Sequence, residues 1–362
     1  MLHKSIFPTQ GSHLGDLARR RIPYDLKAMT LTTRLAVAMI ALVAIAVTAV
    51  GWLSYRSLEQ MIPPRVLDRI ETHSRLIASD LQSHVRSAPA DIASFRSAAA
   101  LNGLIRGHLA GGIDPIDGVS EKTWHQRITE RLAAELDAKP AYSQFRILGI
   151  ENDGREIVRV DRSGPNGTVR IVPEAELQRK GDRSYFKDAI KLGAGEIYVS
   201  VLDLNQENGI IERPHVPTLR VATPVFAPNG NPFGIIIINV DMRPVFDRVR
   251  SSARRGGKIY VVNKRGDYLV HPDSTREFGS ELGAPTDWRA DFPHLAASLG
   301  TLQGVADIVP DQAGQPSAAA FAPAILAGRE WVAVIETVPN AVIMGPAAAI
   351  QKTSVLVGYW PC

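Results

Sequence analysis

The longest apolar stretch of the chain lies near its N-terminus. Residues 35–53 read LAVAMIALVAIAVTAVGWL and contain no charged side chain. At about 1.5 Å per residue such a helix extends roughly 28 Å, which is enough to cross the hydrocarbon core of a bilayer. Trp52 and Tyr55 follow at its end, where aromatic side chains favour the membrane interface. The pattern predicts a transmembrane helix over residues 35–55.

The segment before this helix indicates its orientation. Residues 1–34 carry more Lys and Arg than Asp, and such basic flanks stay in the cytoplasm. We therefore expect the residues after the helix to lie outside the cytoplasm. A cleavable signal peptide is the alternative, because VTA at 47–49 resembles a cleavage site, but the apolar run is longer than signals usually have. With Cys362 as its single cysteine, the exported part has no internal disulfide, which fits a bacterial inner-membrane protein with a periplasmic domain.

A helical pattern follows the membrane segment. Pro63 and Pro64 are predicted to end the membrane-proximal turn. Between Leu67 and His84, apolar residues then recur every three or four positions with charged residues on the other face. We predict a long helical stalk over residues 56–139. Its stripe suits either packing on a sheet or a parallel helix pair in a homodimer.

From Phe145 the period changes to that of strands. FRILGIENDGREIVRVDR holds two apolar runs around NDG, which predicts a hairpin with positive φ in the turn. A similar unit, KIYVVNKRGDYLVHPD, begins at Lys258, and each unit is followed later by FAP and another apolar run. The repetition predicts an α/β fold with two tandem modules that contain antiparallel sheets, at residues 140–243 and 256–338.

The last part of the sequence is again apolar. Residues 339–362 include SVLVGYW, which is too short to span a membrane. We expect a C-terminal helix here that leads to the start of a second membrane crossing. A cytoplasmic output domain is expected to follow that crossing in a longer protein.

Motifs and charge argue against several functions. Lys and Arg number 41 against 37 Asp and Glu, and beyond the N-terminal segment the two signs are mixed, so no nucleic-acid surface is expected. The sequence has no phosphate-binding loop, dinucleotide fingerprint or nucleophile elbow, and its histidines lack metal-ligand spacing. We predict no catalytic residue, no metal and no cofactor. Two alternatives are a periplasmic hydrolase that uses Asp203 and Asp241 as acid and base, and a ligand-free dimerisation module.

The stretch GDRSYFKDAIKLGAGEIYVS concentrates binding chemistry in the first module. The planar guanidinium of Arg183 is suited to a carboxylate. Tyr185 and Phe186 can form the wall of a small site, and Tyr198 adds a hydroxyl from the following strand. Asp241 ends the apolar strand GIIIINVD and needs a partner there, which can be a protein cation, a backbone turn or a ligand ammonium. These groups predict a pocket for a small polar metabolite.

A polar segment, LNQENGIIERPHVPTLR, lies between two later strands. Asp203 and Arg220 are on or beside strands, and we expect them to contact the pocket or to form a mutual salt bridge. For Glu207 and Glu212 a solvated loop is the favoured interpretation, and a rim over the pocket is the alternative.

Together these segments resemble the double Cache sensor domain of bacterial transmembrane receptors. The resemblance covers about residues 56–345 and is most specific between Arg183 and Asp241. It implies two PAS-like modules on a long N-terminal helix, with the small ligand bound in the membrane-distal module. Such domains belong to chemoreceptors, sensor histidine kinases and cyclic-di-GMP enzymes, so the expected function is transmembrane signalling.

A subset of that family binds amino acids and is marked by an ordered set of residues. The set is a tyrosine, then an arginine, an aromatic pair, a second tyrosine and an aspartate. The matching positions here are Arg183, Tyr185, Phe186, Tyr198 and Asp241. Gln178 stands where the first tyrosine is expected. The resemblance therefore implies a ligand that is amino-acid-like or carboxylate-like.

Overall fold

The computed structural model describes residues 30–163, 167–254, 256–299, 303–311 and 314–343, with the side chains of 54–63 left out. The chain divides into two compact units, Met1–Glu59 and Gln60–Cys362, and each is treated by itself. The predicted C-terminal helix and most of the basic N-terminal segment lie outside the described residues.

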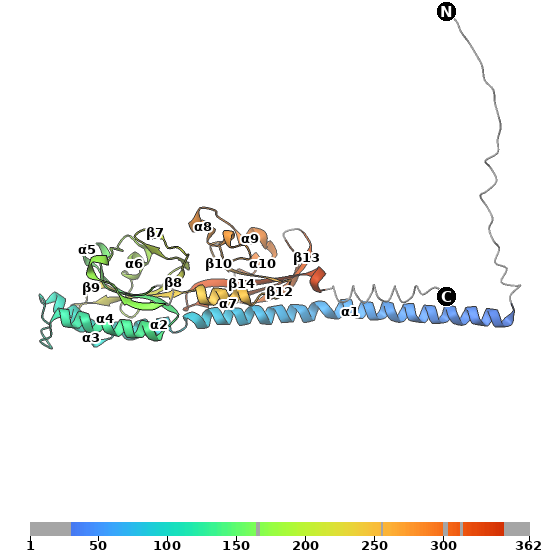
Figure 1. Ribbon diagram of the computed structural model, residues 1–362, viewed down its shortest axis with the longest axis horizontal. Coiled ribbons are helices and arrows are strands. Elements are labelled where there is room, and N and C mark those ends of the chain that lie inside the picture. Colours follow the sequence, from blue (N-terminus) through green and yellow to red (C-terminus); the bar gives the residue numbers. More distant parts are fainter. Residues whose placement is uncertain (1–29, 164–166, 255, 300–302, 312–313, 344–362) are drawn as a thin grey trace, which may run out of the picture. The chain divides into compact units, whose positions relative to one another are not determined.

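The first unit contains an apolar helical segment. Helix α1 (Leu31–Val85, Figure 1) includes Leu31–Leu53, whose mean hydropathy is 2.5 and whose side chains are unburied. Within the described part of the chain this is the one segment long and apolar enough to cross a membrane, a property it shares with signal sequences. The prediction that Pro63 and Pro64 end a turn is wrong, because α1 runs through both. Proline has no backbone N–H, so the helix lacks only the hydrogen bonds that residues 63 and 64 would have donated.

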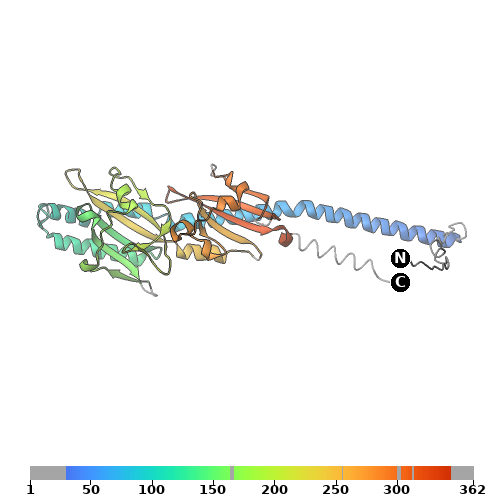
Figure 2. The ribbon, with the colours of Figure 1, turned by 90° about the horizontal axis from the view of Figure 1, so that it is seen from above.

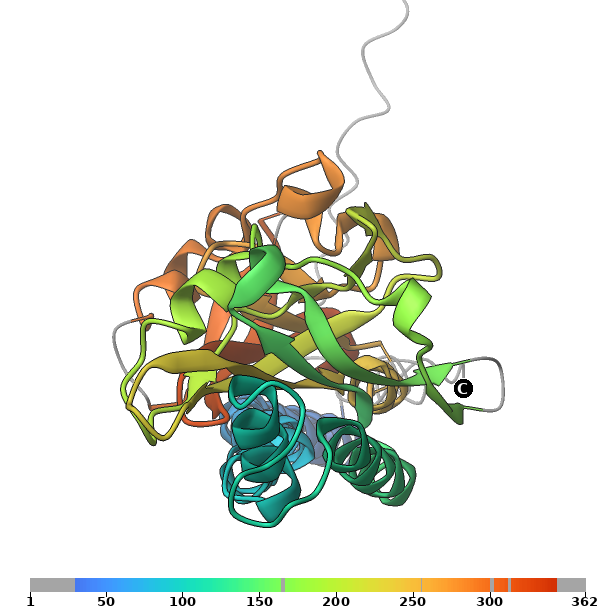
Figure 3. The same ribbon diagram turned by 90° about the vertical axis from the view of Figure 1, so that its left-hand side faces the viewer.

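The second unit begins with helices on one face of a sheet. The last turns of α1 are followed by α2 (Ala88–Arg96), α3 (Ala99–Leu109) and α4 (Glu121–Ala138). Ser120 caps α4 by accepting a hydrogen bond from the Thr123 amide at 3.2 Å. Figure 3 shows these helices beneath the sheet, and α2 and α4 contact its strands. The region predicted as a stalk thus consists of several helices.

The first sheet is antiparallel and has the order β3-β2-β1-β9-β8-β4, with β5 paired to β8. Its strands are β1 (Tyr142–Gly149), β2 (Glu156–Ser163), β3 (Thr168–Ile171), β4 (Tyr198–Val199), β5 (Asp203–Leu204), β8 (Pro217–Phe226) and β9 (Pro232–Asp241). The β1–β2 turn contains Asn152 and Asp153 with φ of 52° and 60°. The predicted positive-φ hairpin is confirmed.

Short elements cover the other face of this sheet. They are α5 (Glu151–Gly154), a 3-10 turn η2 (Glu174–Glu176), α6 (Ser184–Ala189), β6 (Gln206–Glu207) and β7 (Ile210–Ile211). Tyr185 and Phe186 of α6 pack on Ile235 and Ile237 of β9. We call this side the outer face of the first sheet, in contrast to the side that packs on the helices.

The second sheet has the order β11-β10-β14-β13-β12 and is also antiparallel. Its strands are β10 (Lys258–Asn263), β11 (Tyr268–Val270), β12 (Val305–Pro310), β13 (Pro316–Leu326) and β14 (Glu330–Pro339). Its helices and turns are α7 (Arg243–Ser251), η3 (Ser274–Arg276), α8 (Gly279–Leu282), α9 (Trp288–Asp291) and α10 (Pro293–Ala296). Figure 2 shows the two sheets, the first in green and yellow and the second in orange and red. The order β11-β10-β14-β13 repeats β2-β1-β9-β8, so the predicted fold class of two tandem α/β modules is confirmed.

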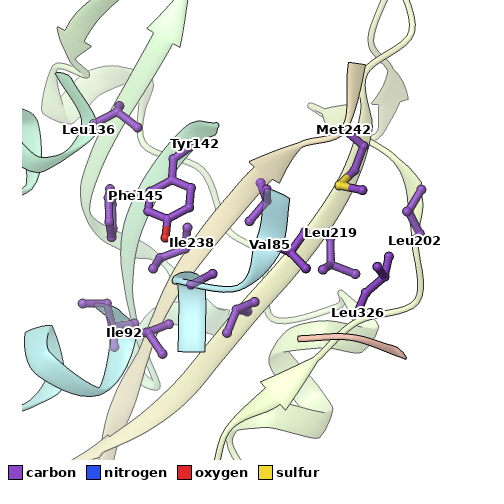
Figure 4. Close-up of a cluster of buried hydrophobic side chains, with 14 of the residues drawn as sticks. Val85, Ile92, Leu136, Tyr142, Phe145, Leu202, Leu219, Ile238, Met242 and Leu326 are labelled. Atoms are coloured by element: carbon purple, nitrogen blue, oxygen red, sulfur yellow. The ribbon is translucent and has the colours of Figure 1, made fainter. Parts of the chain in front are cut away.

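The two modules share one hydrophobic core. It continues from Ile92 and Leu136 of the helices to Ile238 of β9 and on to Leu326 of β13 (Figure 4). Leu202, between β4 and β5, is fully buried in the same cluster. The segment around β5 is therefore held by residues of both modules.

Two carboxylates of the second module bind the backbone of this segment. The amide of Leu202 donates to Glu330 at 3.3 Å, and the amide of Leu204 donates to Glu281 at 2.9 Å. Burial raises the pKa of Glu330, and burial together with the nearby Asp203 raises the pKa of Glu281 to about 7. These contacts place titrating groups at the junction of the modules, on either side of Asp203.

Glu281→Gln should change how stability depends on pH. The folded pKa of Glu281 lies above the ordinary value of a glutamate, 4.5, so the folded chain binds more protons than the unfolded chain between about pH 4.5 and 7. This residue therefore lowers the free energy of unfolding as pH rises. The variant should lose that decline, a difference on the order of 2 kcal/mol between pH 4.5 and pH 8. Denaturant titration at both pH values measures it. The exposed Glu130→Gln serves as control, and parallel profiles for wild type and Glu281→Gln would contradict the prediction.

Candidate ligand-binding site

The outer face of the first sheet changes from apolar to polar along its strands. Leu148, Ile235 and Ile237 line the apolar end beneath α6. Toward the other end the same face carries buried polar side chains from three adjacent strands: Gln144 and Arg146 on β1, Asn239 on β9, and Thr218 and Arg220 on β8. We call these side chains, with the residues that bind them, the polar cluster.

Arg146 is a deeply buried cation of the polar cluster, with 2% of its side chain exposed. Its guanidinium donates to Asn239 Oδ1 at 2.9 Å and to the Tyr185 hydroxyl at 3.3 Å, and it lies 3.5 Å from Glu156. Burial alone would lower the pKa of Arg146, but Tyr185 and Glu156 raise it, so the group stays charged. Its Nε finds no hydrogen-bond partner among the described residues.

Arg220 is the second buried cation, on β8. It forms an ion pair with Asp203 and donates to Asn205 Oδ1 at 3.2 Å. The predicted Asp203–Arg220 salt bridge is therefore present. The ring of Tyr185 lies 5.2 Å from the guanidinium carbon of Arg220 and 5.5 Å from that of Arg146. Like Arg146, Arg220 keeps an Nε without a partner in the part of the chain that the structure describes.

Glu207 closes the polar cluster from above, on the β6–β7 hairpin. Its carboxylate accepts hydrogen bonds from Gln144, Arg159 and Gln178, each at 2.9 Å. Although burial works in the opposite direction, Arg159 and Arg146 lower the pKa of Glu207 to about 2. The interpretation of Glu207 as part of a solvated loop is wrong, because these donors draw the hairpin onto the sheet.

Two further cations complete the cluster. Arg159 of β2 bonds Asp161 at 2.9 Å and lies 3.8 Å from Glu156. Lys180 is 4% exposed, and burial together with Arg146 lowers its pKa to about 8. Because these cations are buried, the positive charge of each one has to be compensated by the neighbouring carboxylates.

A cavity of about 700 Å³ opens beside the cluster. Its lining includes Arg159, Asp161, Gln178, Lys180, Arg183 and Glu207. Charged and amide groups thus dominate the wall where the cluster meets the opening. This composition is suited to a small polar ligand rather than an apolar one.

The predicted site residues occupy different places around this cavity. Arg183 lines it from the residue before α6 and donates to Gln206 at 2.7 Å. Tyr185 lies over the two buried guanidinium groups, whereas Phe186 belongs to the apolar cluster. Tyr198 of β4 packs beside that apolar cluster, and burial raises its pKa to about 12.

Asp241 shares the outer face of the sheet, since it is paired with Thr218 just as Asp203 is. Its carboxylate accepts a hydrogen bond from the Arg243 amide at 2.9 Å and is bound by the Arg243 guanidinium, with its closest contact at 2.6 Å. A protein cation and a backbone turn therefore supply the partner that its position requires. Asp203 is likewise paired with an arginine, so each carboxylate of the hydrolase alternative has a cation as its partner in this structure.

Sequence reasoning missed the centre of the cluster. Arg146 interrupts the apolar run FRILG and Asn239 interrupts GIIIINVD. A charged or amide side chain within a strand that is apolar on both sides has to find partners in the interior. That signal was visible in the sequence, but the partners came from elements that no local pattern connects.

Across the described ranges no group of three or more His, Cys, Asp or Glu side chains is arranged to hold an ion. The cluster is instead a set of hydrogen-bond donors and ion pairs.

Comparison with known proteins gives this site its context. Residues 120–294 match the sensor-domain family of bacterial histidine kinases. The matched segment runs from the start of α4 into α10 and contains the whole polar cluster. No curated protein sequence matches the chain.

Solved sensor domains share the fold at low sequence identity. The extracellular domain described as that of the histidine kinase vpHK1S-Z8 superposes with a TM-score of 0.62 at 19% identity, over 81% of this chain and 96% of that one. A domain of a sensory box/GGDEF family protein from Vibrio parahaemolyticus gives 0.60 and 19%, over 79% and 98%. The periplasmic sensory domain of the Campylobacter jejuni chemoreceptor Tlp1 gives 0.54 and 13%, over 79% and 96%. The resemblance to the sensor domains of bacterial receptors is confirmed.

Arg146→Met should destabilise the first module. The substitution removes the charge beside Glu156 and a donor to Asn239, which leaves buried polar groups unsatisfied. We expect the free energy of unfolding to fall by about 3 kcal/mol, measured by denaturant titration. The exposed Arg86→Met is the matched control. A loss below about 1 kcal/mol would show that the cluster does not depend on this cation.

Proposed function

We propose that the chain is a membrane-anchored sensor that binds a small carboxylate-bearing metabolite in the cavity of the first module. The observation that carries the proposal is the wall of that cavity, which includes Arg159, Lys180 and Arg183. In the polar cluster, the buried Arg146 and Arg220 each keep an Nε without a hydrogen-bond partner among the described residues. A buried unpaired donor is rare in folded proteins, and an anionic ligand is a partner that would satisfy it.

Charge in the cavity region supports an anionic ligand. The cavity is lined by five cations, Arg159, Arg170, Arg179, Lys180 and Arg183, and by four carboxylates, Asp161, Glu176, Asp182 and Glu207. An excess of positive charge in a partly desolvated site favours a carboxylate over a neutral metabolite.

The predicted site residues have roles in this proposal. Arg183 binds the ligand from the cavity wall, while Tyr185 and Tyr198 exclude water from one side. Asp203 and Arg220 contact the ligand by exchanging their mutual ion pair for one with it. Asp241 would reach a ligand amine only by leaving Arg243, so a carboxylate without an amine is the ligand that the geometry favours over an amino acid.

Location and signalling follow from the anchor. We infer a cytoplasmic N-terminus, an inner-membrane helix and a sensor in the periplasm. For signalling, the ligand must bind one arrangement of the modules more tightly than another. In the second module, His73 of α1 contacts Glu336 of β14, with 2.7 Å between Nδ1 and the carboxylate. A shift of α1 would therefore also displace β14.

We infer a homodimer through the exposed face of α1. Leu76 is 65% exposed there, and a second copy of the helix would cover it. Light scattering of the detergent-solubilised chain should give the mass of two copies. A mass of one copy at micromolar concentration would contradict the dimer.

Ligand binding is tested by thermal shift on the full chain in detergent. We expect stabilisation by at least one member of a panel of mono- and dicarboxylates and amino acids, and none by uncharged polyols. Arg183→Ala should weaken binding of the stabilising compound by roughly tenfold or more, since a charge-assisted hydrogen bond contributes about 1.5–3 kcal/mol. Arg289→Ala, in the second module, is the control. Stabilisation by no carboxylate would end the proposal, and chemical conversion of the compound would favour the hydrolase.

A further inference from the structure

The carboxylate of Glu207 is surrounded by side-chain donors, as the carboxylate of a bound ligand would be. Its Oε1 accepts hydrogen bonds from Gln144 Nε2 at 2.9 Å and Asn205 Nδ2 at 3.1 Å. Its Oε2 accepts from Arg159 Nη1 and Gln178 Nε2, both at 2.9 Å, and lies 3.7 Å from the Lys180 ammonium. Both oxygens are therefore satisfied by side chains, with two cations and three amides around them.

Four of these five donors come from parts of the fold outside the hairpin, and the fifth, Asn205, directly precedes β6. Gln144 belongs to β1 and Arg159 to β2, in the middle of the sheet. Gln178 and Lys180 lie in the segment before α6, and Glu156 fixes the backbone of Gln178 at 2.9 Å. The donor set is thus built on the scaffold, which is how preorganised binding sites are made.

The hairpin that delivers Glu207 is short and partly exposed. β6 and β7 pair over two residues each, and Ile210 is 72% exposed. The turn at Asn208 and Gly209 has φ of 50° and 77°. Besides Glu207, the hairpin contacts the scaffold through Ile211, which packs at the edge of the hydrophobic core, and through polar groups such as Gln206 with Arg183 and Asn208 with Gln178. Polar contacts of this kind exchange readily with water or with a competing ligand.

The cavity leads to three of the five donors. Arg159, Gln178, Lys180 and Glu207 all form part of its wall. A carboxylate that enters from solvent would therefore meet the groups that now hold Glu207. The low pKa of Glu207, about 2, keeps it ionised and bound in the absence of a competitor.

We propose that the donor set of Gln144, Arg159, Gln178, Lys180 and Asn205 is the carboxylate subsite of the cavity, and that Glu207 fills it as an internal competitor. This inference rests on the proposed function and assigns the position of the ligand's carboxylate. Binding then exchanges one carboxylate for another, so the charge of the cluster is unchanged while the hairpin is released. Release of residues 206–211 is the local structural change that binding produces.

Chemical rescue tests the subsite without knowledge of the natural ligand. Glu207→Ala removes the internal carboxylate and leaves its donors in place. In the full chain in detergent, acetate and formate should raise the melting temperature of the variant in a saturable way, relative to chloride at equal ionic strength. The shift should exceed that of wild type at least threefold. An equal response of variant and wild type would overturn the proposal.

Two variants serve as controls. Glu207→Gln fills the same space with a neutral amide, and acetate should give it no saturable shift beyond that of wild type. Glu212→Ala removes the other carboxylate of the same segment, which Asn205 alone binds at 3.0 Å, and acetate should not stabilise it more than wild type. Rescue of Glu212→Ala as strong as that of Glu207→Ala would also overturn the assignment.

Hydrogen exchange on the wild type covers the case in which Glu207→Ala does not fold. High acetate should accelerate exchange of the amides in 206–211, because it displaces Glu207, while exchange in β1 and β9 stays constant. Unchanged or slower exchange in the hairpin would overturn the proposal.

The outcomes separate this inference from the function on which it rests. Rescue by acetate with no metabolite shifting the wild type supports the subsite and contradicts the metabolite sensor. A metabolite that stabilises wild type without any acetate rescue of Glu207→Ala supports the sensor and contradicts the subsite.

Discussion

The compensation of buried positive charge is the constraint on which the first module depends. Arg146 and Arg220 lie on the outer face of the sheet with almost no exposure. A charge in such a position is tolerated only when acceptors surround it. Segments that cover this face accordingly supply acceptors. Tyr185 of α6 accepts from Arg146, Asp203 and Asn205 of the β5 region accept from Arg220, and Glu207 of the hairpin accepts from the neighbouring Arg159. The segments that lie over the polar cluster therefore contact it through polar groups, and a polar ligand can replace such contacts.

The helical face of the same sheet shows the contrasting solution. There Ile236, Ile238 and Val240 of β9 pack against the helices without any polar partner. Alternation along one strand thus separates a permanent apolar core from an exchangeable polar layer. The scaffold gains its stability on one side, which leaves the other side free to contain the strained and partly satisfied groups that binding sites need.

Local features were predictable from the sequence because local residues determine them. The turn at Asn152–Gly154, the apolar helix and the repeated hairpin are each specified within a few residues, and the repeat gave the two-module fold. Arg183 and Tyr185 were found because they are close in sequence. Glu207 could not be placed in that way, since its position depends on donors from two strands and a separate loop. Long-range compensation of charge has no local pattern, and this is why the centre of the cluster was missed.

The junction of the modules connects this chemistry to the rest of the chain. Asp203 pairs with Arg220, while the amides on either side of it are bound by Glu281 and Glu330 of the second module. The short strand β5 is thereby attached to both modules at once. If Asp203 changed its partner, the hydrogen bonds of the adjacent amides to Glu281 and Glu330 would be affected directly. Such a change would not require the hydrophobic core to rearrange.

A competitor that is covalently attached to its receptor has a fixed effective concentration. Glu207 cannot be diluted, so any external carboxylate has to exceed a level set by the length and stiffness of the β6–β7 hairpin. Substitutions in that exposed turn can raise or lower the detection threshold while the cavity wall keeps its selectivity. The sensitivity of the receptor and its choice of ligand can then evolve separately.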